Sequence, residues 1–149
     1  MVGFIFPGQG AQYVGMGKDF YQNFSESKDI FDSSDKILGF SLSKICFQGP
    51  QEELTRTQNC QPAILTTSIA ILEVFRKKIK DSPKFVAGLS LGEYPALVAA
   101  GSLAFLDALV LVKKRAELME DEAKKNPGAM AAILGLEKEI LLNICKETN

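Results

Sequence analysis

The stretch that most constrains the fold of this chain is an apolar run followed by a serine between two glycines. Phe85–Ala87 leads into Gly88-Leu89-Ser90-Leu91-Gly92, and an alanine-rich helical pattern continues to Gly101. In this context G-x-S-x-G is typical of a nucleophile elbow, a sharp strand-to-helix turn that exposes the serine hydroxyl. The sequence therefore predicts a strand, a turn carrying Ser90 as candidate nucleophile, and a helix. A glycine-rich turn capped by serine is the alternative interpretation.

Composition limits the classes of partner. The 149 residues are 46% hydrophobic, which is enough for a packed core in one domain. The 17 basic and 18 acidic residues give a net charge of −1, so we expect neither nucleic acid nor an anionic membrane as a partner. Cys46, Cys60 and Cys145 lack the spacing of a metal site or a disulfide framework, and we expect no metal. Without a signal-peptide pattern or a membrane-length apolar run, a cytoplasmic protein is expected.

A second candidate ligand-binding segment lies near the N-terminus. Val2–Phe6 is predicted to form a buried strand, followed by the glycine-containing loop Pro7–Gln12. Open α/β sheets bind ligands at the carboxyl ends of their strands, and the glycines let the backbone come close to a bound group. The backbone N–H of Gln9 is therefore a candidate hydrogen-bond donor, with an ordinary strand-to-helix turn as the alternative. The loop has neither the P-loop lysine nor Rossmann spacing, so nucleotide binding is not expected.

Two long helices are predicted, with short helices between residues 15 and 58. Gln61 and Pro62 are expected to open the first, because proline favours the first helical position. Gln61 would either form a pocket wall or cap the helix. The second helix runs from about Leu106 to Lys125, and Arg115 lies on its apolar stripe. Its guanidinium would either extend into water or, as a half-buried cation, bind a carboxylate.

A boundary is predicted near Asn126-Pro127-Gly128, which interrupts the helical pattern. Ala129–Leu134 reads as a new strand, and an amphipathic helix is expected from Glu137 towards Lys146. The sequence thus predicts one unit over residues 1–125 and the beginning of a second over residues 126–149.

Four motifs in order, PGQGAQ, QPAI, GLSLGEYPAL and KKRAELM, resemble the malonyl-CoA:acyl carrier protein transacylase family. The resemblance covers essentially the whole chain, but only about the N-terminal half of the family's catalytic domain. It implies an α/β fold with a parallel sheet flanked by helices, in an incomplete α/β-hydrolase-like acyltransferase subdomain over residues 1–125. The segment 126–149 would begin a small ferredoxin-like subdomain.

The resemblance also implies a function. A malonyl group would pass from coenzyme A to the thiol of acyl carrier protein through a seryl acyl-enzyme, in fatty acid biosynthesis. Malonyl-CoA and acyl carrier protein are then the partners, and no cofactor is needed. The family's site residues map onto this sequence as the nucleophile Ser90, the oxyanion-hole amides of Gln9 and Leu91, the carboxylate-binding Arg115, and the pocket residues Gln61 and Met119.

The sequence departs from the family at two points. Leu89 stands where the family usually has histidine, as in some stand-alone acyltransferases of polyketide synthesis. The chain also contains no histidine at all, so nothing in it matches the family's catalytic base. We therefore expect a half enzyme that is nearly inactive unless a C-terminal half supplies the histidine, with an uncovered sheet edge that favours self-association. A serine hydrolase and a non-catalytic binding fragment are the alternatives.

Overall fold

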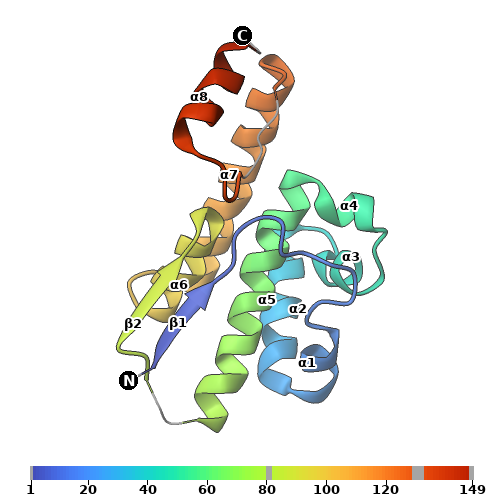
Figure 1. Cartoon of the computed structure of the whole chain (residues 1–149). Helices are drawn as coiled ribbons and strands as arrows, with labels where there is room; N and C mark the ends of the chain where they lie inside the picture. Colours follow the sequence, from blue (N-terminus) through green and yellow to red (C-terminus); the bar gives the residue numbers. More distant parts are fainter. Residues whose placement is uncertain (1, 80–81, 129–132, 148–149) are drawn as a thin grey trace.

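The computed structural model describes residues 2–79, 82–128 and 133–147, and Figure 1 shows their arrangement. Helices dominate the described chain, and two short strands come together from distant parts of the sequence. The elements in chain order are β1 (Gly3–Phe6), α1 (Lys18–Asn23), α2 (Ser25–Leu38), α3 (Leu42–Gln48), α4 (Gln51–Thr55), α5 (Thr57–Lys78), β2 (Phe85–Gly88), the 3₁₀ turn η1 (Ser90–Gly92), α6 (Glu93–Ala99), α7 (Phe105–Lys125) and α8 (Lys138–Glu147).

The two strands form a parallel pair, as predicted. Gly3 lies opposite Phe85, and Phe6 lies opposite Gly88. Parallel strands need a crossover connection, and here α1 to α5 supply it. Because the strands run in the same direction, the carboxyl ends of both strands lie at the same end of the sheet. This register brings the loop after β1 and the turn after β2 side by side.

Helix α5 runs through the centre of the molecule, between α1–α4 on one side and the strands with α6 on the other (Figure 1). Its buried side chains include Leu65 and Ile69, and it packs against α2, α6 and α7. Phe75 of α5 meets Phe4 of β1 edge to face, with ring centroids 5.1 Å apart. The strands are thus fixed on a rigid helix. No helix within the described ranges combines the length and apolarity needed to cross a bilayer.

The start of α5 differs from the prediction. The helix begins at Thr57, and Pro62 lies inside it rather than at its first position. The N–H groups of Asn59 and Cys60 both donate to the carbonyl of Arg56, at 2.9 and 2.8 Å, so the first turn forms ahead of the proline. Gln61 is therefore an interior helical residue, and its interpretation as a cap is wrong.

The predictions for the C-terminal part of the chain agree with the structure for its two helices but not for the described part of the strand predicted between them. Helix α7 matches the predicted second long helix, and α8 matches the helix predicted from Glu137. None of the described residues of α8 is buried. The strand predicted over 129–134 falls mostly outside the described residues, and the described pair, Ile133 and Leu134, is not in a strand. The boundary near residue 125 and the ferredoxin-like second unit stay predictions.

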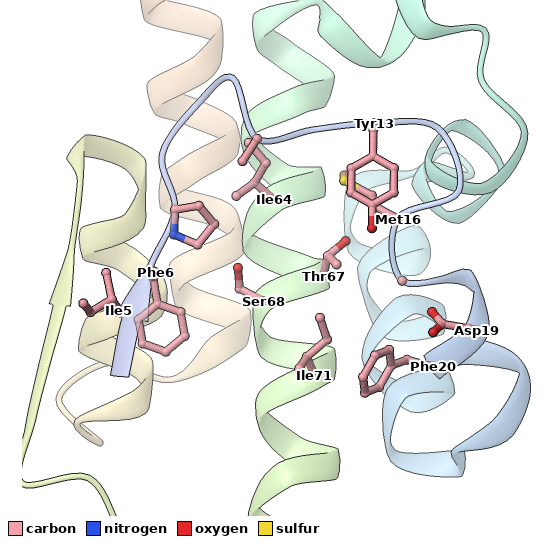
Figure 2. A pocket seen from close by; sticks show the side chains of 13 residues that line it. Ile5, Phe6, Tyr13, Met16, Asp19, Phe20, Ile64, Thr67, Ser68 and Ile71 are labelled. Carbon is pink, nitrogen blue, oxygen red and sulfur yellow. The ribbon is translucent and has the colours of Figure 1, made fainter. Parts of the chain in front are cut away.

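An apolar pocket borders the free edge of β1 (Figure 2). Within the described chain β1 pairs only with β2, and the Ile5 side chain is 81% exposed. The pocket has a volume of about 380 Å³ and lies between β1, the loop that follows it, α1 and α5. Phe6, Ile64 and Ile71 contribute to its wall. Ser90 and Arg115 do not line it, so this pocket is separate from the predicted site.

Candidate active site

The turn after β2 has the geometry of a nucleophile elbow. Ser90 has φ +54°, a left-handed conformation that residues other than glycine rarely adopt. A Cβ atom at Gly88 would lie 1.9 Å from the carbonyl oxygen of Gly92, and one at Gly92 would lie 2.4 Å from the carbonyl oxygen of Phe6. Neither position can hold a side chain unless the backbone shifts. Close packing therefore requires both glycines, and the predicted strand, turn and helix are confirmed.

The loop after β1 lies directly against this elbow. A Cβ atom at Gly8 would lie 2.7 Å from the carbonyl oxygen of Leu89, and the N–H of Leu89 donates to the carbonyl of Phe6 at 3.4 Å. In the part of the chain that the structure describes, the backbone N–H groups of Gln9 and Leu91 have no hydrogen-bond partner. Both amides are thus free to donate to a bound group.

Helix α7 brings a cation to the serine. The Nη2 of Arg115 donates to the Oγ of Ser90 at 3.0 Å, and its Nη1 donates to the Oε1 of Gln61 at 2.6 Å. Val112, one turn before Arg115, is fully buried and anchors the helix, whereas Leu118, one turn after Arg115, is exposed. Arg115 is half-buried, and its head is held by two partners instead of extending only into water.

Gln61 joins the remaining residues. Its side chain is fully buried, with 0% exposure. Its Nε2 donates to the Oε1 of Gln9 and to the Sδ of Met119, each at 3.3 Å. One carboxamide therefore links the first loop, α5 and α7.

The structure brings all six predicted site residues into one region. Ser90, Arg115, Gln61, Gln9 and Met119 form one chain of hydrogen bonds, and Leu91, with a buried side chain, follows Ser90 directly. The sequence pattern pointed only to the backbone N–H of Gln9, and the contact of the Gln9 side chain with Gln61 was not predicted. The two residues are 52 positions apart, so no local pattern could have revealed this contact.

The charge of the site comes from Arg115, since the other five residues are neutral. Burial raises the pKa of the neighbouring Cys60 thiol to about 11, so this group is also uncharged at neutral pH. Within residues 2–79, 82–128 and 133–147, no group of three or more metal-ligating side chains occurs. A hydroxyl, free amides and a single cation suit nucleophilic attack on the carbonyl of an anionic substrate.

Comparison with known proteins agrees with this chemistry. The family described as acyl transferase domain matches residues 3–147. The chain belongs to this family. Among its relatives, the malonyl CoA-acyl carrier protein transacylase of Bacillus subtilis strain 168 is 52% identical over 143 residues, which cover 96% of this chain and 45% of the relative. The resemblance stated from the four motifs is therefore confirmed.

Solved structures confirm the acyl transferase fold. The MCAT of Streptococcus pneumoniae superposes with a TM-score of 0.86 at 43% identity, over 99% of this chain and 48% of that protein. A malonyl-transacylase solved with the acyl carrier protein of a type II polyketide synthase superposes with a TM-score of 0.85 at 40% identity, over 98% of this chain and 47% of that one. This chain thus spans less than half the length of these proteins.

Proposed function

We propose that this chain supplies the nucleophile and the acyl-binding cation of a cytoplasmic acyltransferase that moves malonyl from coenzyme A to acyl carrier protein in fatty acid biosynthesis. The contact of Arg115 Nη2 with Ser90 Oγ, at 3.0 Å, carries the proposal. In a malonyl thioester one methylene separates the carboxylate from the reactive carbonyl. A guanidinium beside the nucleophile matches this short spacing and can hold the carboxylate through two hydrogen bonds. The names of the relatives support the same substrate.

In the first half-reaction, Ser90 Oγ attacks the thioester carbonyl carbon, and the N–H groups of Gln9 and Leu91 stabilise the oxyanion. Collapse forms the seryl ester and breaks the carbon–sulfur bond. The serine proton passes to a general base and then to the departing sulfur, so coenzyme A leaves as a thiol. In the second half-reaction the thiol of acyl carrier protein attacks the ester, and Ser90 regains its proton.

The general base is the part of the reaction that these 149 residues do not supply, because they contain no histidine. We propose that a histidine outside these residues takes the role of the base. It would lie in a segment that corresponds to the part of the relatives that this chain does not cover. General base catalysis contributes about 10²–10⁴-fold to rates of this kind, so this chain alone is expected to acylate slowly.

Selection of malonyl over acetyl follows from the partners of Arg115. The cation is not unpaired without substrate, since Ser90 and Gln61 both accept from it. The cost that an acetyl group incurs is therefore smaller than that of leaving a lone buried charge unpaired. Hydrogen bonds to charged groups contribute about 1.5–3 kcal/mol each, which corresponds to a preference of about ten- to a hundredfold for malonyl.

The test combines this chain with the complementary half of the Bacillus subtilis relative and follows malonyl transfer by intact mass. Malonyl should pass from malonyl-CoA through the chain to acyl carrier protein. Ser90→Ala should abolish transfer, whereas Ser102→Ala, an exposed serine beyond the other end of α6, should leave it unchanged. Transfer by the Ser90→Ala variant would exclude the proposed nucleophile. Rapid stoichiometric acylation of the chain alone would exclude the need for an external base.

The same assay separates the alternatives. A serine hydrolase would release free malonate instead of charging the carrier protein. A role in polyketide synthesis is favoured by the solved complex of a relative with such a carrier and by Leu89, whose side chain is 74% exposed beside Ser90. Comparing carrier proteins of the two pathways in the transfer assay decides between them. If the combined protein with Ser90 intact shows neither carrier charging nor malonate release, the non-catalytic binding role is left.

A further inference from the structure

We infer that Gln61 is a positioning residue that holds Arg115 and the loop after β1 in one geometry, so that carboxylate binding and oxyanion stabilisation depend on a single buried carboxamide. The inference rests on the proposed function, and it gives Gln61 a role in addition to lining the pocket. It assigns to Gln61 an action through Arg115 and Gln9 instead of a contact with substrate.

The hydrogen bonds of Gln61 leave its carboxamide one orientation. A guanidinium only donates, so the atom facing Arg115 Nη1 at 2.6 Å must be the oxygen. The amide nitrogen then points away, and its two hydrogens have two acceptors, Gln9 Oε1 and Met119 Sδ. A fully buried carboxamide with all of these groups paired is costly to rotate, because rotation would leave buried polar atoms unsatisfied.

The location of Gln61 suits this role. It lies in the interior of α5, where the next five residues, 62–66, are also buried. A group on a packed helix is held more rigidly than one on a loop. Arg115, in contrast, is a long side chain that is only half-buried. When a carboxylate draws Nη2 away from Ser90, the bond from Nη1 to Gln61 persists and serves as the fixed point of the guanidinium.

The contact with Gln9 extends the action to the oxyanion amide. Gln9 lies in an exposed loop, and within the described residues its side chain has one hydrogen bond, to Gln61. This bond fixes the residue whose backbone N–H would face the reacting carbonyl. A change at Gln61 should therefore disturb two functions that belong to different segments of the chain.

Two variants and one control test the action of Gln61 on Arg115. Gln61→Met keeps the length and approximate volume of the side chain but loses all three hydrogen bonds. Gln61→Glu keeps an acceptor for Arg115 and loses the donors to Gln9 and Met119. Gln58→Met makes the same chemical change at an exposed position on the same helix and is the matched control.

The first measurement is the order of the Arg115 side chain, from the NMR relaxation of its Nε–H group in this 149-residue chain. Gln61→Met should make the group mobile, whereas Gln61→Glu and Gln58→Met should leave it ordered. The second measurement is the Kd of malonyl-CoA and acetyl-CoA in the Ser90→Ala background, which prevents acylation. Gln61→Met should weaken the binding of malonyl-CoA by about tenfold or more, since a hydrogen bond to a charged group is lost. The same variant should change the binding of acetyl-CoA little. Gln61→Glu should also weaken the binding of malonyl-CoA, because the new carboxylate neutralises Arg115.

Action through Arg115 predicts non-additivity. Once Arg115→Met has removed the cation, adding Gln61→Met should change the affinity for malonyl-CoA no further. An additional loss, or an Arg115 group that stays ordered in folded Gln61→Met, would overturn the inference. If Gln61→Met does not fold, as judged by its circular dichroism, an Arg115 group that becomes mobile in Gln61→Glu would overturn the inference instead. Equal binding of both thioesters by the parent chain, with Arg115 mobilised in Gln61→Met, would instead refute the proposed function and leave the positioning role intact.

Discussion

Replacing Gly92 by alanine tests whether close packing of the first loop on the elbow holds the candidate site together. The added Cβ would lie 2.4 Å from the carbonyl oxygen of Phe6 and 2.9 Å from that of Pro7, whereas ordinary contacts begin at 3.4 Å. Both atoms belong to the backbone, so neither can rotate away. The end of β1 must move by about 1 Å relative to the elbow, on the scale of overpacking that costs about 1–3 kcal/mol.

Two smaller effects act in opposite directions. The shift would weaken the bond from the N–H of Leu89 to the carbonyl of Phe6, which adds about 0.5–1.5 kcal/mol. Gly92 has φ −60°, so alanine fits its backbone and gains about 0.4–1 kcal/mol from the unfolded state. We expect the free energy of unfolding to fall by about 1–3 kcal/mol in total.

Urea unfolding of the 149-residue chain measures this loss, with two glycines as controls. Gly128→Ala meets nothing closer than 4.0 Å and should be nearly neutral. Gly101 has φ +75° and open space around it, so Gly101→Ala should show backbone strain alone, about 1–2 kcal/mol. If Gly92→Ala were as stable as Gly128→Ala, the close approach of loop and elbow would be wrong, and the shared site with it.

Two further predictions concern other parts of the fold. Burial, with a smaller contribution from the Asp35 carboxylate, raises the pKa of the Cys46 thiol from 9.0 to about 12. The contribution of the neutral Cys46 thiol to the free energy of unfolding is full below pH 9.0 and is lost as the pH rises towards 12. The urea midpoint should therefore be lower at about pH 10.5 than at about pH 8.5, and this decrease should be smaller in Cys46→Ala. At the free edge of β1, Ile5→Lys should reduce concentration-dependent self-association in light scattering, whereas Leu97→Lys, exposed on α6, should not. Equal association of both variants would exclude the β1 edge as the contact.

Local patterns predicted most of the elements because local interactions determine them. The elbow was predictable since only glycine fits at residues 88 and 92, and that restriction appears directly in the sequence. Helix α7 followed from its apolar periodicity. The start of α5 was mispredicted because proline was taken as a first helical residue. The carbonyl of Arg56, which accepts from two successive N–H groups, begins the helix five residues earlier.

The candidate site was predictable in its residue types but not in its contacts. The motifs identified Ser90 and Arg115, and the apolar stripe suggested a half-buried cation. That Arg115 donates to Ser90 itself depends on the packing of α7 against α5 and α6, which no spacing in the sequence encodes. The bond between Gln61 and Gln9 likewise joins two polar residues that each had an ordinary alternative interpretation.

The contact between Arg115 and Ser90 also bears on the order of events in the proposed reaction. A guanidinium that donates to Oγ occupies one lone pair of the nucleophile and lowers its reactivity towards a carbonyl. A substrate carboxylate offers the same guanidinium a stronger, charged acceptor, and Nη2 can leave Ser90 while Nη1 stays on Gln61. Binding of the correct acyl group would thereby release the nucleophile at the moment it is needed. An acyl group without a carboxylate offers Arg115 no stronger acceptor, so the hydrogen bond from Arg115 to Ser90 would persist. Selection of the acyl group and activation of the serine would then arise from one exchange of hydrogen-bond partners.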